Sequence, residues 1–411
     1  MDMDEQRVRQ SHEYAVNVQL RTHRENIRTS WTTCLEKCLE GTDFVISAIE
    51  VDRYFYWSQD FHIPRQFGFK QPYGENGGPG GIFHAMRNIP PTIRIAREME
   101  KRCPQGWLLN YTNPEPWLIE AVSRLTKIRS VGLCHGVFMG MAQIAHLLER
   151  KVTDLEYSAC GMNHFTFFQA IRDKGTGEDL YPLLREREAK IDLLYDWHEL
   201  GLSRIVFRRF GLWPSPGANH IGEYIGWADE FVASNLQYFY DPANGHPWTG
   251  QPIPDFVYHI GQVPTARPML RPEPKPHSNA IEGELHCSGE VAIPFIEGMA
   301  CGQVRPLDAV NVANHGYMPG IDQGTVVEVP AVANRGELQI APLPRLPEPI
   351  LAMLRTQGSI RKIGVEAYQE QSKHKLLQAV LLEPTITSYR NAVAMVDTLL
   401  GLQKGILPTF T

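Results

Sequence analysis

The chain is 411 residues long, which predicts two or three domains and is enough to bury a large core. Hydrophobic residues make up 43% of it, and 40 Lys and Arg against 46 Asp and Glu leave a formal charge of -6. This balance excludes a disordered chain and argues against nucleic acid as a partner. No segment offers the ~18 uninterrupted apolar residues of a membrane span, and the polar N-terminus does not resemble a signal peptide. Seven cysteines form no dense disulfide framework, so we expect a cytoplasmic protein with a small-molecule partner and no membrane partner.

Three short apolar runs separated by helical patterns predict a parallel sheet. The chain opens with a polar stretch that has the pattern of one amphipathic helix reaching Lys37. The apolar runs follow at residues 43–49, 107–111 and 128–134, and the helical patterns between them lie at 82–101 and 116–125. Buried strands alternating with helices are typical of an α/β fold with a doubly wound, Rossmann-like sheet.

The pattern changes after about residue 150, where we expect longer helices and turns. Nine of the 30 prolines fall in residues 241–277, which predicts an irregular excursion or lid. Helical periodicity returns at 347–404 and predicts a helical layer closing a second domain. We therefore divide the chain into a domain at 1–150 and a second at 151–411.

Two candidate ligand-binding segments lie near the predicted strand ends, where open parallel sheets build their sites. The first holds five glycines at 74–81, and it is either a tight, multiply turned loop or a cradle for a ligand. It is not a dinucleotide fingerprint, because Phe83 stands where the third glycine would be. The second contains Asn110 and Asn113, whose carboxamides can bind sugar hydroxyls or simply form an Asn-Pro turn.

A thiol and an imidazole lie at the ends of two apolar runs. Cys134 ends the third apolar run, and His164 follows a shorter run at 155–160. Two such ligands with open positions for substrate oxygens suit a divalent metal, although either residue alone is more often part of a core. A third cluster, at 220–224, places an imidazole, a carboxylate and a phenol together as a reservoir for acid and base chemistry.

These motifs together resemble glycoside hydrolase family 4. They are Asp-Phe-Val-Ile at 43–46, Gly-Pro-Gly-Gly at 78–81, Asn-Tyr-Thr-Asn-Pro at 110–114, Gly-Leu-Cys-His-Gly at 132–136, Gly-Met-Asn-His at 161–164 and His-Ile-Gly-Glu-Tyr at 220–224. Segments at 288–290, 311–316 and 326–330 extend the resemblance over essentially the whole chain. The resemblance implies a Rossmann-like NAD-binding domain followed by a catalytic and oligomerising α+β domain of the lactate/malate dehydrogenase type. It also implies glycoside cleavage by a redox and elimination route that uses NAD and Mn²⁺ or another divalent metal.

The resemblance also implies roles for individual residues. Cys134 and His164 match the metal ligands, and His135 matches a proton donor. Asn113, with Asn110, matches the sugar-binding asparagine. The base lies within 219–224, where we place Tyr224 first and His220 second.

Two substitutions point to the substrate. Relatives that act on 6-phosphorylated sugars carry an arginine where this chain has Trp57, and an Asp or Asn where it has His135. We therefore expect an unphosphorylated α-glycoside, namely a galactoside, a glucoside or a uronide. Arg53, Arg65, Arg87 and His84 are candidates to meet a uronate carboxylate or are ordinary solvated residues. The resemblance further implies a homodimer or homotetramer.

The nucleotide site also departs from the pattern of the family. Asp2, Asp4, Ile49 and Glu50 lie at the strand ends expected to contact NAD, but the glycine-rich strand-loop-helix unit that should precede Asp2 is not in the sequence. We expect a missing unit of roughly 20 to 30 residues and weak NAD binding by the chain as written. Two other hypotheses remain: a non-catalytic sugar-binding or regulatory relative, and a simple NAD-dependent dehydrogenase.

Overall fold

The computed structural model describes the chain except residue 25 and residues 193–196, 232–284 and 286–287. The proline-rich tract at 241–277 lies outside the described residues. Among the described helices, none is long and apolar enough to cross a membrane.

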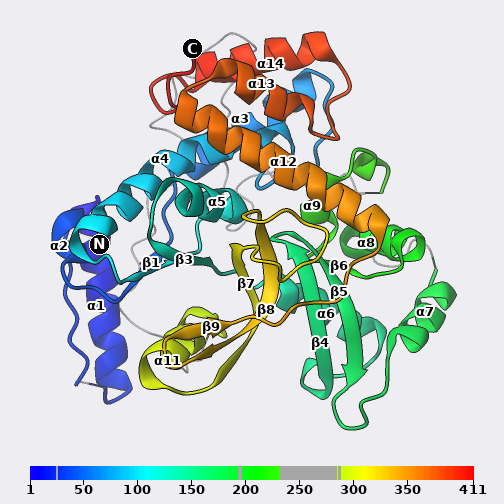
Figure 1. The fold of residues 1–411 in the computed structure, drawn as a ribbon, viewed down its shortest axis with the longest axis horizontal. Coiled ribbons are helices and arrows are strands. Elements are labelled where there is room, and N and C mark those ends of the chain that lie inside the picture. Colours follow the sequence, from blue (N-terminus) through cyan, green and yellow to red (C-terminus); the bar gives the residue numbers. More distant parts are fainter. Residues whose placement is uncertain (25, 193–196, 232–284, 286–287) are drawn as a thin grey trace.

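One mixed sheet of nine strands runs through the described part of the molecule (Figure 1). Its order is β1-β2-β3-β7-β8-β4-β5-β6, with β9 paired to β8. The strands are β1 (Phe44–Ser47), β2 (Trp107–Asn110), β3 (Arg129–Gly132), β4 (Leu155–Met162), β5 (Phe165–Asp173), β6 (Pro214–Ser215), β7 (Arg305–Ala313), β8 (Val326–Asn334) and β9 (Glu337–Gln339). The first three strands are parallel and the remaining pairs are antiparallel. The predicted α/β class, with an N-terminal parallel sheet and a C-terminal α+β part, is confirmed.

Helices lie before, between and after these parallel strands in the N-terminal half. They are α1 (Glu5–Arg21), α2 (Leu35–Leu39), α3 (Arg53–Gln66), α4 (Gly78–Arg102), α5 (Glu115–Leu125) and α6 (Gly136–Leu147). Of these, α3 and α4 connect β1 to β2, and α5 connects β2 to β3. The single helix predicted up to Lys37 is wrong, because α1 ends at Arg21 and a Thr- and Ser-rich stretch separates it from α2. Hydroxyl side chains compete for backbone hydrogen bonds and so break helices.

The expectation of helices and turns after residue 150 is only partly right. Helices do occur there: α7 (Tyr181–Lys190), α8 (Trp197–Phe210), α9 (Ala218–Ile221) and α11 (Ala292–Cys301), with 3₁₀ turns at Val152–Asp154, Gly222–Tyr224 and Ala228–Glu230. Of the long strands, β4 was anticipated as the short run at 155–160, whereas β5, β7 and β8 were not predicted. Their pairing is antiparallel, and each contains a run of four consecutive buried residues, so neither a crossover helix nor a continuous apolar alternation marks them in the sequence.

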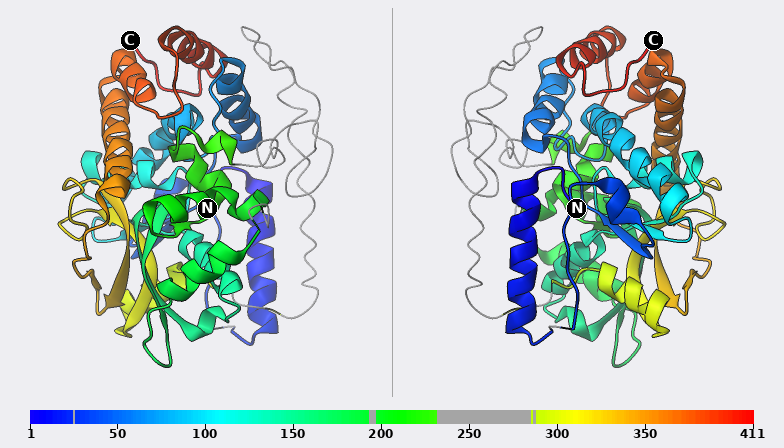
Figure 2. Two further views of the ribbon diagram at one scale, coloured as in Figure 1. Left: turned by 90° about the vertical axis from the view of Figure 1, so that its right-hand side faces the viewer. Right: turned by 90° about the vertical axis from the view of Figure 1, so that its left-hand side faces the viewer.

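The C-terminal helices form a layer over the N-terminal half. They are α12 (Glu348–Glu370), α13 (Lys373–Leu381) and α14 (Tyr389–Leu402), within the predicted range 347–404. Leu376 and Leu399 share an apolar cluster with Phe83 of α4 and Leu108 of β2. Figures 1 and 2 show α12–α14 beside α3 and α4. The layer therefore packs on elements before residue 150, and the division at 150 stays a proposal.

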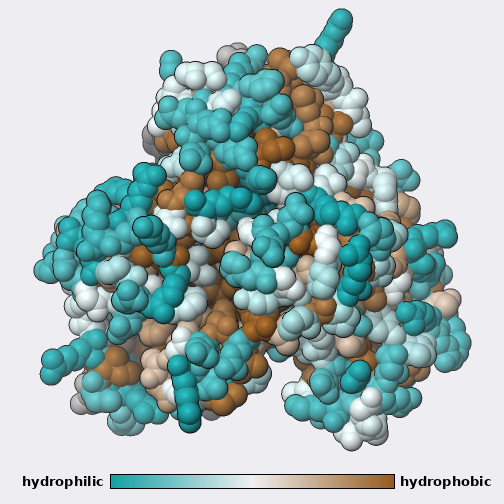
Figure 3. Space-filling model, in the orientation of Figure 1, coloured by the Kyte–Doolittle hydropathy of each residue, from teal (hydrophilic) through white to brown (hydrophobic). Residues whose placement is uncertain are grey.

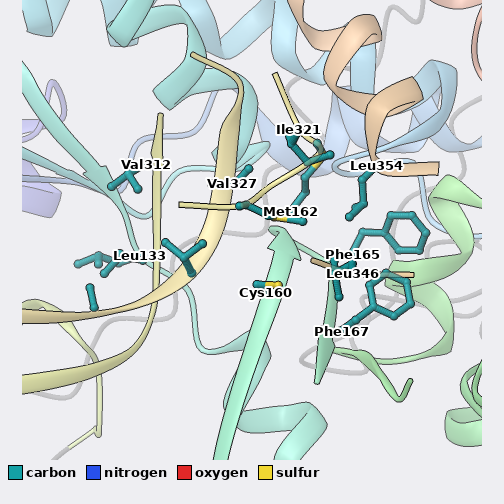
Figure 4. Packing of buried hydrophobic residues seen from close by; sticks show 14 of the residues in the cluster. Leu133, Cys160, Met162, Phe165, Phe167, Val312, Ile321, Val327, Leu346 and Leu354 are labelled. Atoms are coloured by element: carbon teal, nitrogen blue, oxygen red, sulfur yellow. The ribbon is translucent and has the colours of Figure 1, made fainter. Parts of the chain in front are cut away.

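A second apolar cluster surrounds the junction of the two sheet halves (Figure 4). Leu133 and Phe165 belong to it, and each is buried next to a candidate metal ligand, Cys134 and His164. Close packing of their neighbours restrains both ligands. On the face in Figure 3, hydrophobic surface gathers near the centre, where the N-terminal strands meet β7 and β8.

The glycine-rich segment at 74–81, which forms the turn before α4 and its first residues, is packed against the protein interior. A Cβ on Gly80 would lie 2.5 Å from the carbonyl oxygen of Asp60, and one on Gly77 would lie 2.6 Å from the ring of Tyr224. Gln71 fills the remaining space by accepting from the amide of Gly80 at 3.0 Å. Of the two interpretations left open by the sequence, the tight loop is the one that the structure has.

Gly80→Ala is expected to lower the free energy of unfolding by about 1–3 kcal/mol, because the added methyl overlaps fixed backbone. The control is Gly401→Ala in α14, where nothing lies within 4 Å of the added Cβ and alanine favours the helix. Denaturant unfolding of both variants measures the difference. Equal stability of the two variants would contradict the packing described.

Glu383, in the turn after α13, gives stability a distinct pH dependence. Burial raises the pKa of its carboxyl to about 8, although Gln357 donates to it at 3.4 Å. In the unfolded chain a glutamate titrates near ~4.3, so the folded state holds a proton that the unfolded state has lost between these pH values. The free energy of unfolding should therefore fall as the pH rises through this window.

Glu383→Gln removes the cost of ionising this buried carboxyl. We expect the variant to gain stability over the wild type at pH 8 and the difference to shrink towards pH 5, as measured by denaturant unfolding at both values. Glu337→Gln, at an exposed position of β9, is the control. A difference that does not change with pH would sink the prediction.

Candidate active site

Several candidate residues lie where the parallel strands end. Glu50 follows β1, Asn113 follows β2 and Cys134 follows β3, so the three enter the same edge of the sheet. His164 occupies the turn between β4 and β5 with a φ of 63°. Such left-handed backbone is unusual for histidine and persists where surrounding structure fixes it.

Cys134 and His164 face one another. Sγ of Cys134 lies 3.7 Å from Nε2 of His164, and the backbone amide of Gly136 contacts the same sulfur at 3.4 Å. A sulfur and a nitrogen bound to one tetrahedral metal would be about 3.6 Å apart. The separation therefore fits two ligands of a single ion.

Glu75 and His220 lie on the other side of His164. Ligand atoms of Glu75, His164 and His220 all fall within 4.8 Å of one another. The two imidazole rings are 4.3 Å apart, and Oε2 of Glu75 is 3.9 Å from Nδ1 of each. Sequence reasoning did not select Glu75. The available signal was a single acidic residue inside the glycine-rich run at 74–81.

Burial controls the charges of this cluster. It raises the pKa of the Cys134 thiol to about 12, with the Glu328 carboxylate adding to the effect. Burial lowers the pKa of His164 to about 3 and that of His220 to about 4. A thiol and a neutral imidazole thus face each other, and a cation between them would favour loss of the thiol proton.

Glu75 is ionised in spite of its burial. Burial alone would raise its pKa, but the guanidinium of Arg53 and the neighbouring imidazoles lower it to about 2. Arg53 contacts one carboxylate oxygen directly, and Nδ2 of Asn113 donates to the same oxygen at 2.9 Å. The negative charge is therefore held next to His164 and His220.

The two asparagines behave differently. Asn113 lies in the cluster through Glu75, whereas Asn110 turns away from it. The side chain of Asn110 donates to the carbonyl of Thr112 at 2.9 Å and is fully buried. Asn110 therefore closes the turn after β2.

The candidate acid and base residues occupy contrasting places. His135, at the start of α6, is exposed and lies 3.4 Å from Oε1 of Glu290. Tyr224 is buried, stacks on Phe165 at 4.9 Å and directs its hydroxyl to the carbonyl of Asn163 at 3.4 Å. Burial and the nearby Glu223 raise the pKa of Tyr224 well above its usual value. Of the two base candidates, His220 is the one in contact with His164.

The residues expected to contact NAD are engaged within the protein. Oδ1 of Asp4 accepts from the amide of Arg7 at 3.0 Å as the cap of α1, and Oδ1 of Asp2 accepts from the amide of Asp4 at 2.9 Å. The amide of Ile49 donates to Thr112 at 2.8 Å. Burial would raise the pKa of Glu50, but His84 and Arg53 lower it to about 2.

An aromatic row leads from Arg53 to the cluster. The guanidinium lies 4.0 Å from the ring centre of Trp57, Trp57 meets Tyr73 at 5.1 Å, and Tyr73 meets His220 at 4.6 Å. Two other side chains considered for a uronate contact carboxylates: Arg87 contacts Asp60 at 2.5 Å, and His84 contacts Glu50 at 3.2 Å. Arg65 donates to the backbone carbonyl of Gln71 at 3.2 Å.

Comparison with known proteins identifies the family. The model of family 4 glycosyl hydrolases matches residues 1–150, and that of the family's C-terminal domain matches residues 159–386. The chain is 28% identical to an α-glucosidase of Erwinia rhapontici over 412 residues (91% of this chain, 84% of the relative) and 28% identical to an α-galactosidase of Bacillus subtilis over 376 residues (90% and 83%). It also resembles the structure of a 6-phospho-α-glucosidase from gut microorganisms in complex with NAD and Mn²⁺, with a TM-score of 0.78, 22% identity and coverage of 100% and 91%. The two family models together span most of the sequence, and the chain belongs to glycosyl hydrolase family 4.

Proposed function

We propose that this chain hydrolyses unphosphorylated α-glycosides, namely a galactoside, a glucoside or a uronide, with NAD and a divalent metal. The observation that carries the proposal is the partly buried pair of Cys134 and His164, separated by 3.7 Å at the carboxyl edge of the parallel strands. The names of the α-glucosidase and α-galactosidase relatives support the α-glycoside class. A simple dehydrogenase would not need this pair.

Cys134 and His164 would hold the metal. Thiolate and imidazole suit several divalent ions, and their spacing fits joint coordination. When bound, the ion would act as a Lewis acid on the sugar hydroxyls and on the carbonyl formed from one of them. The glycosyl hydrolase solved with Mn²⁺ makes manganese the first ion to test.

We propose NAD as the cofactor because the similar 6-phospho-α-glucosidase was solved in complex with NAD. The described residues fit it only in part. The glycine-rich turn at 74–81 has no room for a pyrophosphate, because Asp60, Gln71 and Tyr224 fill the space beside its glycines. Asp2 and Asp4 can offer only the contacts of a ribose site. We therefore assign roles only to side chains of this chain and none to the bound nucleotide.

His220 is our first choice for the base and Tyr224 the second, the reverse of the order expected from the sequence. Nδ1 of His220 is buried and has no hydrogen-bond partner among the described residues, and the ring contacts His164. It can accept a proton from a sugar carbon held beside the metal. Tyr224 would have to form a phenolate inside an apolar core, which burial opposes.

Glu75, Asn113 and His135 complete the proposed site. Glu75 keeps a negative charge beside His220 and would stabilise that imidazole once it is protonated. The carboxamide of Asn113 would orient a sugar hydroxyl next to Glu75. His135 is exposed at the start of α6, and it would supply a proton to the departing group from the solvent side.

The aromatic row supports an unphosphorylated substrate. Trp57 is 1% exposed and donates through Nε1 to the carbonyl of Tyr73 at 3.3 Å. Its indole ring is therefore held in place and presents an apolar surface. Arg53 is compensated by Glu50 and Glu75. A phosphate would meet two carboxylates and only one guanidinium among these residues.

We also propose a cytoplasmic homodimer or homotetramer. The six described cysteines are free thiols, as is usual in a reducing compartment. Phe138 and Met139 of α6 and Ile293 of α11 are exposed, and apolar side chains of this size favour subunit contacts.

Removing either proposed metal ligand should abolish specific Mn²⁺ binding. We expect Cys134→Ser and His164→Ala to weaken Mn²⁺ by more than about 100-fold, since loss of outer-shell partners alone costs about 10- to 100-fold. Calorimetric titration of the folded variants measures the change. Cys301→Ser, at an exposed cysteine of α11, should bind as the wild type does. Unchanged affinity in both ligand variants would show that the site is wrong.

A panel of nitrophenyl α-glycosides, α-uronides and their 6-phosphates tests the substrate class, with NAD and Mn²⁺ supplied. We expect turnover of at least one neutral sugar or uronide and slower turnover of its 6-phosphate, because Trp57 carries no positive charge to form an ion pair with a phosphate. Faster turnover of any 6-phosphate would refute this part of the proposal. Sugar binding without turnover of any member would instead favour a non-catalytic relative.

A further inference from the structure

The two ring nitrogens of His164 have different neighbours. Nε2 faces Cys134, whereas Nδ1 lies 2.7 Å from the carboxamide of Asn76. A neutral imidazole carries its proton on one nitrogen only, and the hydrogen bond at the other nitrogen decides which. Asn76 is therefore in direct contact with the atom that controls whether Nε2 can bind a metal.

Asn76 is held firmly in this position. Its backbone amide donates to Oε1 of Glu223 at 3.0 Å, and its backbone carbonyl accepts from Nε1 of Trp117 at 3.3 Å. The residue is 1% exposed. With the backbone fixed from two elements, the freedom that remains is rotation of the carboxamide, which exchanges its oxygen and nitrogen.

Each orientation of the carboxamide selects one tautomer of His164. When Nδ2 faces the ring, it donates to Nδ1 at 2.7 Å and to Glu75 at 3.2 Å, and the imidazole proton must be on Nε2, towards Cys134. Oδ1 is then buried with no hydrogen-bond partner in the part of the chain that the structure describes. When Oδ1 faces the ring, it accepts the proton of Nδ1, and Nε2 presents a lone pair towards Cys134. This second orientation gives up the contact with Glu75 but pairs the buried oxygen with a donor that metal binding strengthens.

We propose that Asn76 is a positioning residue that selects the tautomer of His164 and thereby sets the affinity of the metal site. The metal-free protein holds Nδ2 towards the ring, and metal binding turns the carboxamide. The inference rests on the proposed metal pair of Cys134 and His164. Its tautomer part concerns the metal-free chain and can be tested separately.

Two substitutions at this position separate the possibilities. Asn76→Asp keeps the shape and can only accept, so it should place the proton on Nδ1 before any metal is present. Asn76→Leu has nearly the same volume and can neither donate nor accept. We expect Mn²⁺ to bind Asn76→Asp at least as tightly as the wild type and Asn76→Leu about 10- to 100-fold more weakly.

The tautomer is read from long-range ¹H–¹⁵N spectra of metal-free protein labelled at histidine, with His164 assigned by its loss in His164→Ala. We expect the Nε2–H form in the wild type and the Nδ1–H form in Asn76→Asp. The same tautomer in both proteins, or wild-type Mn²⁺ affinity in Asn76→Leu, would overturn the proposal. If Asn76→Leu does not fold, the spectrum of Asn76→Asp decides. Cys134→Ser is titrated in parallel, so that Mn²⁺ binding without Cys134 would count against the proposed metal pair and leave the tautomer result to stand alone.

Discussion

A buried negative charge on Glu75 constrains much of the region around the site. A carboxylate out of water is stable only when cations and hydrogen-bond donors replace the lost solvation. Arg53 of α3 and Asn113 after β2 provide these partners, and the backbone amides on either side, those of Glu75 and Asn76, both donate to Glu223. Segments far apart in the sequence thus meet at one side chain. Removing that charge would leave Arg53 and Asn113 without their shared acceptor.

The C-terminal helices α12–α14 and the turns between them stabilise the segment that carries Glu75. Arg361 of α12 forms a buried ion pair with Glu120 of α5 at 3.2 Å and donates to the carbonyl of Val326 in β8 at 2.8 Å. The backbone amide of Gly78 hydrogen-bonds to Glu383 after α13, next to Asn76 and Glu75. Helices that carry none of the proposed chemistry therefore help to fix the turn on which the chemistry depends.

The sequence predicted those features that local pattern determines. Apolar runs identified β1–β3, and their alternation with helical patterns indicated where Cys134 and Asn113 lie. The antiparallel strands β5, β7 and β8 escaped prediction, because each contains a run of four consecutive buried residues that removes the alternation. Glu75 was missed for a different reason: its importance comes from Arg53, His164 and His220, whose approach to it is a property of the fold. Spacing could not rank His220 and Tyr224, since both belong to one short segment and only packing separates them.

The sheet is continuous from the parallel strands to the antiparallel ones, and this has a consequence for how the protein folds. Gly132 at the end of β3 pairs with Asn311 of β7, 179 positions later in the chain. During synthesis, β3, which ends just before Cys134, must wait for most of the C-terminal half before it can pair with β7. Such long-range pairing makes folding slow, because the cost of closing a long loop comes before the contacts that offset it. The edge beside the proposed metal ligand is therefore open to wrong partners until β7 arrives, and conditions that slow association between nascent chains should improve the yield of native protein.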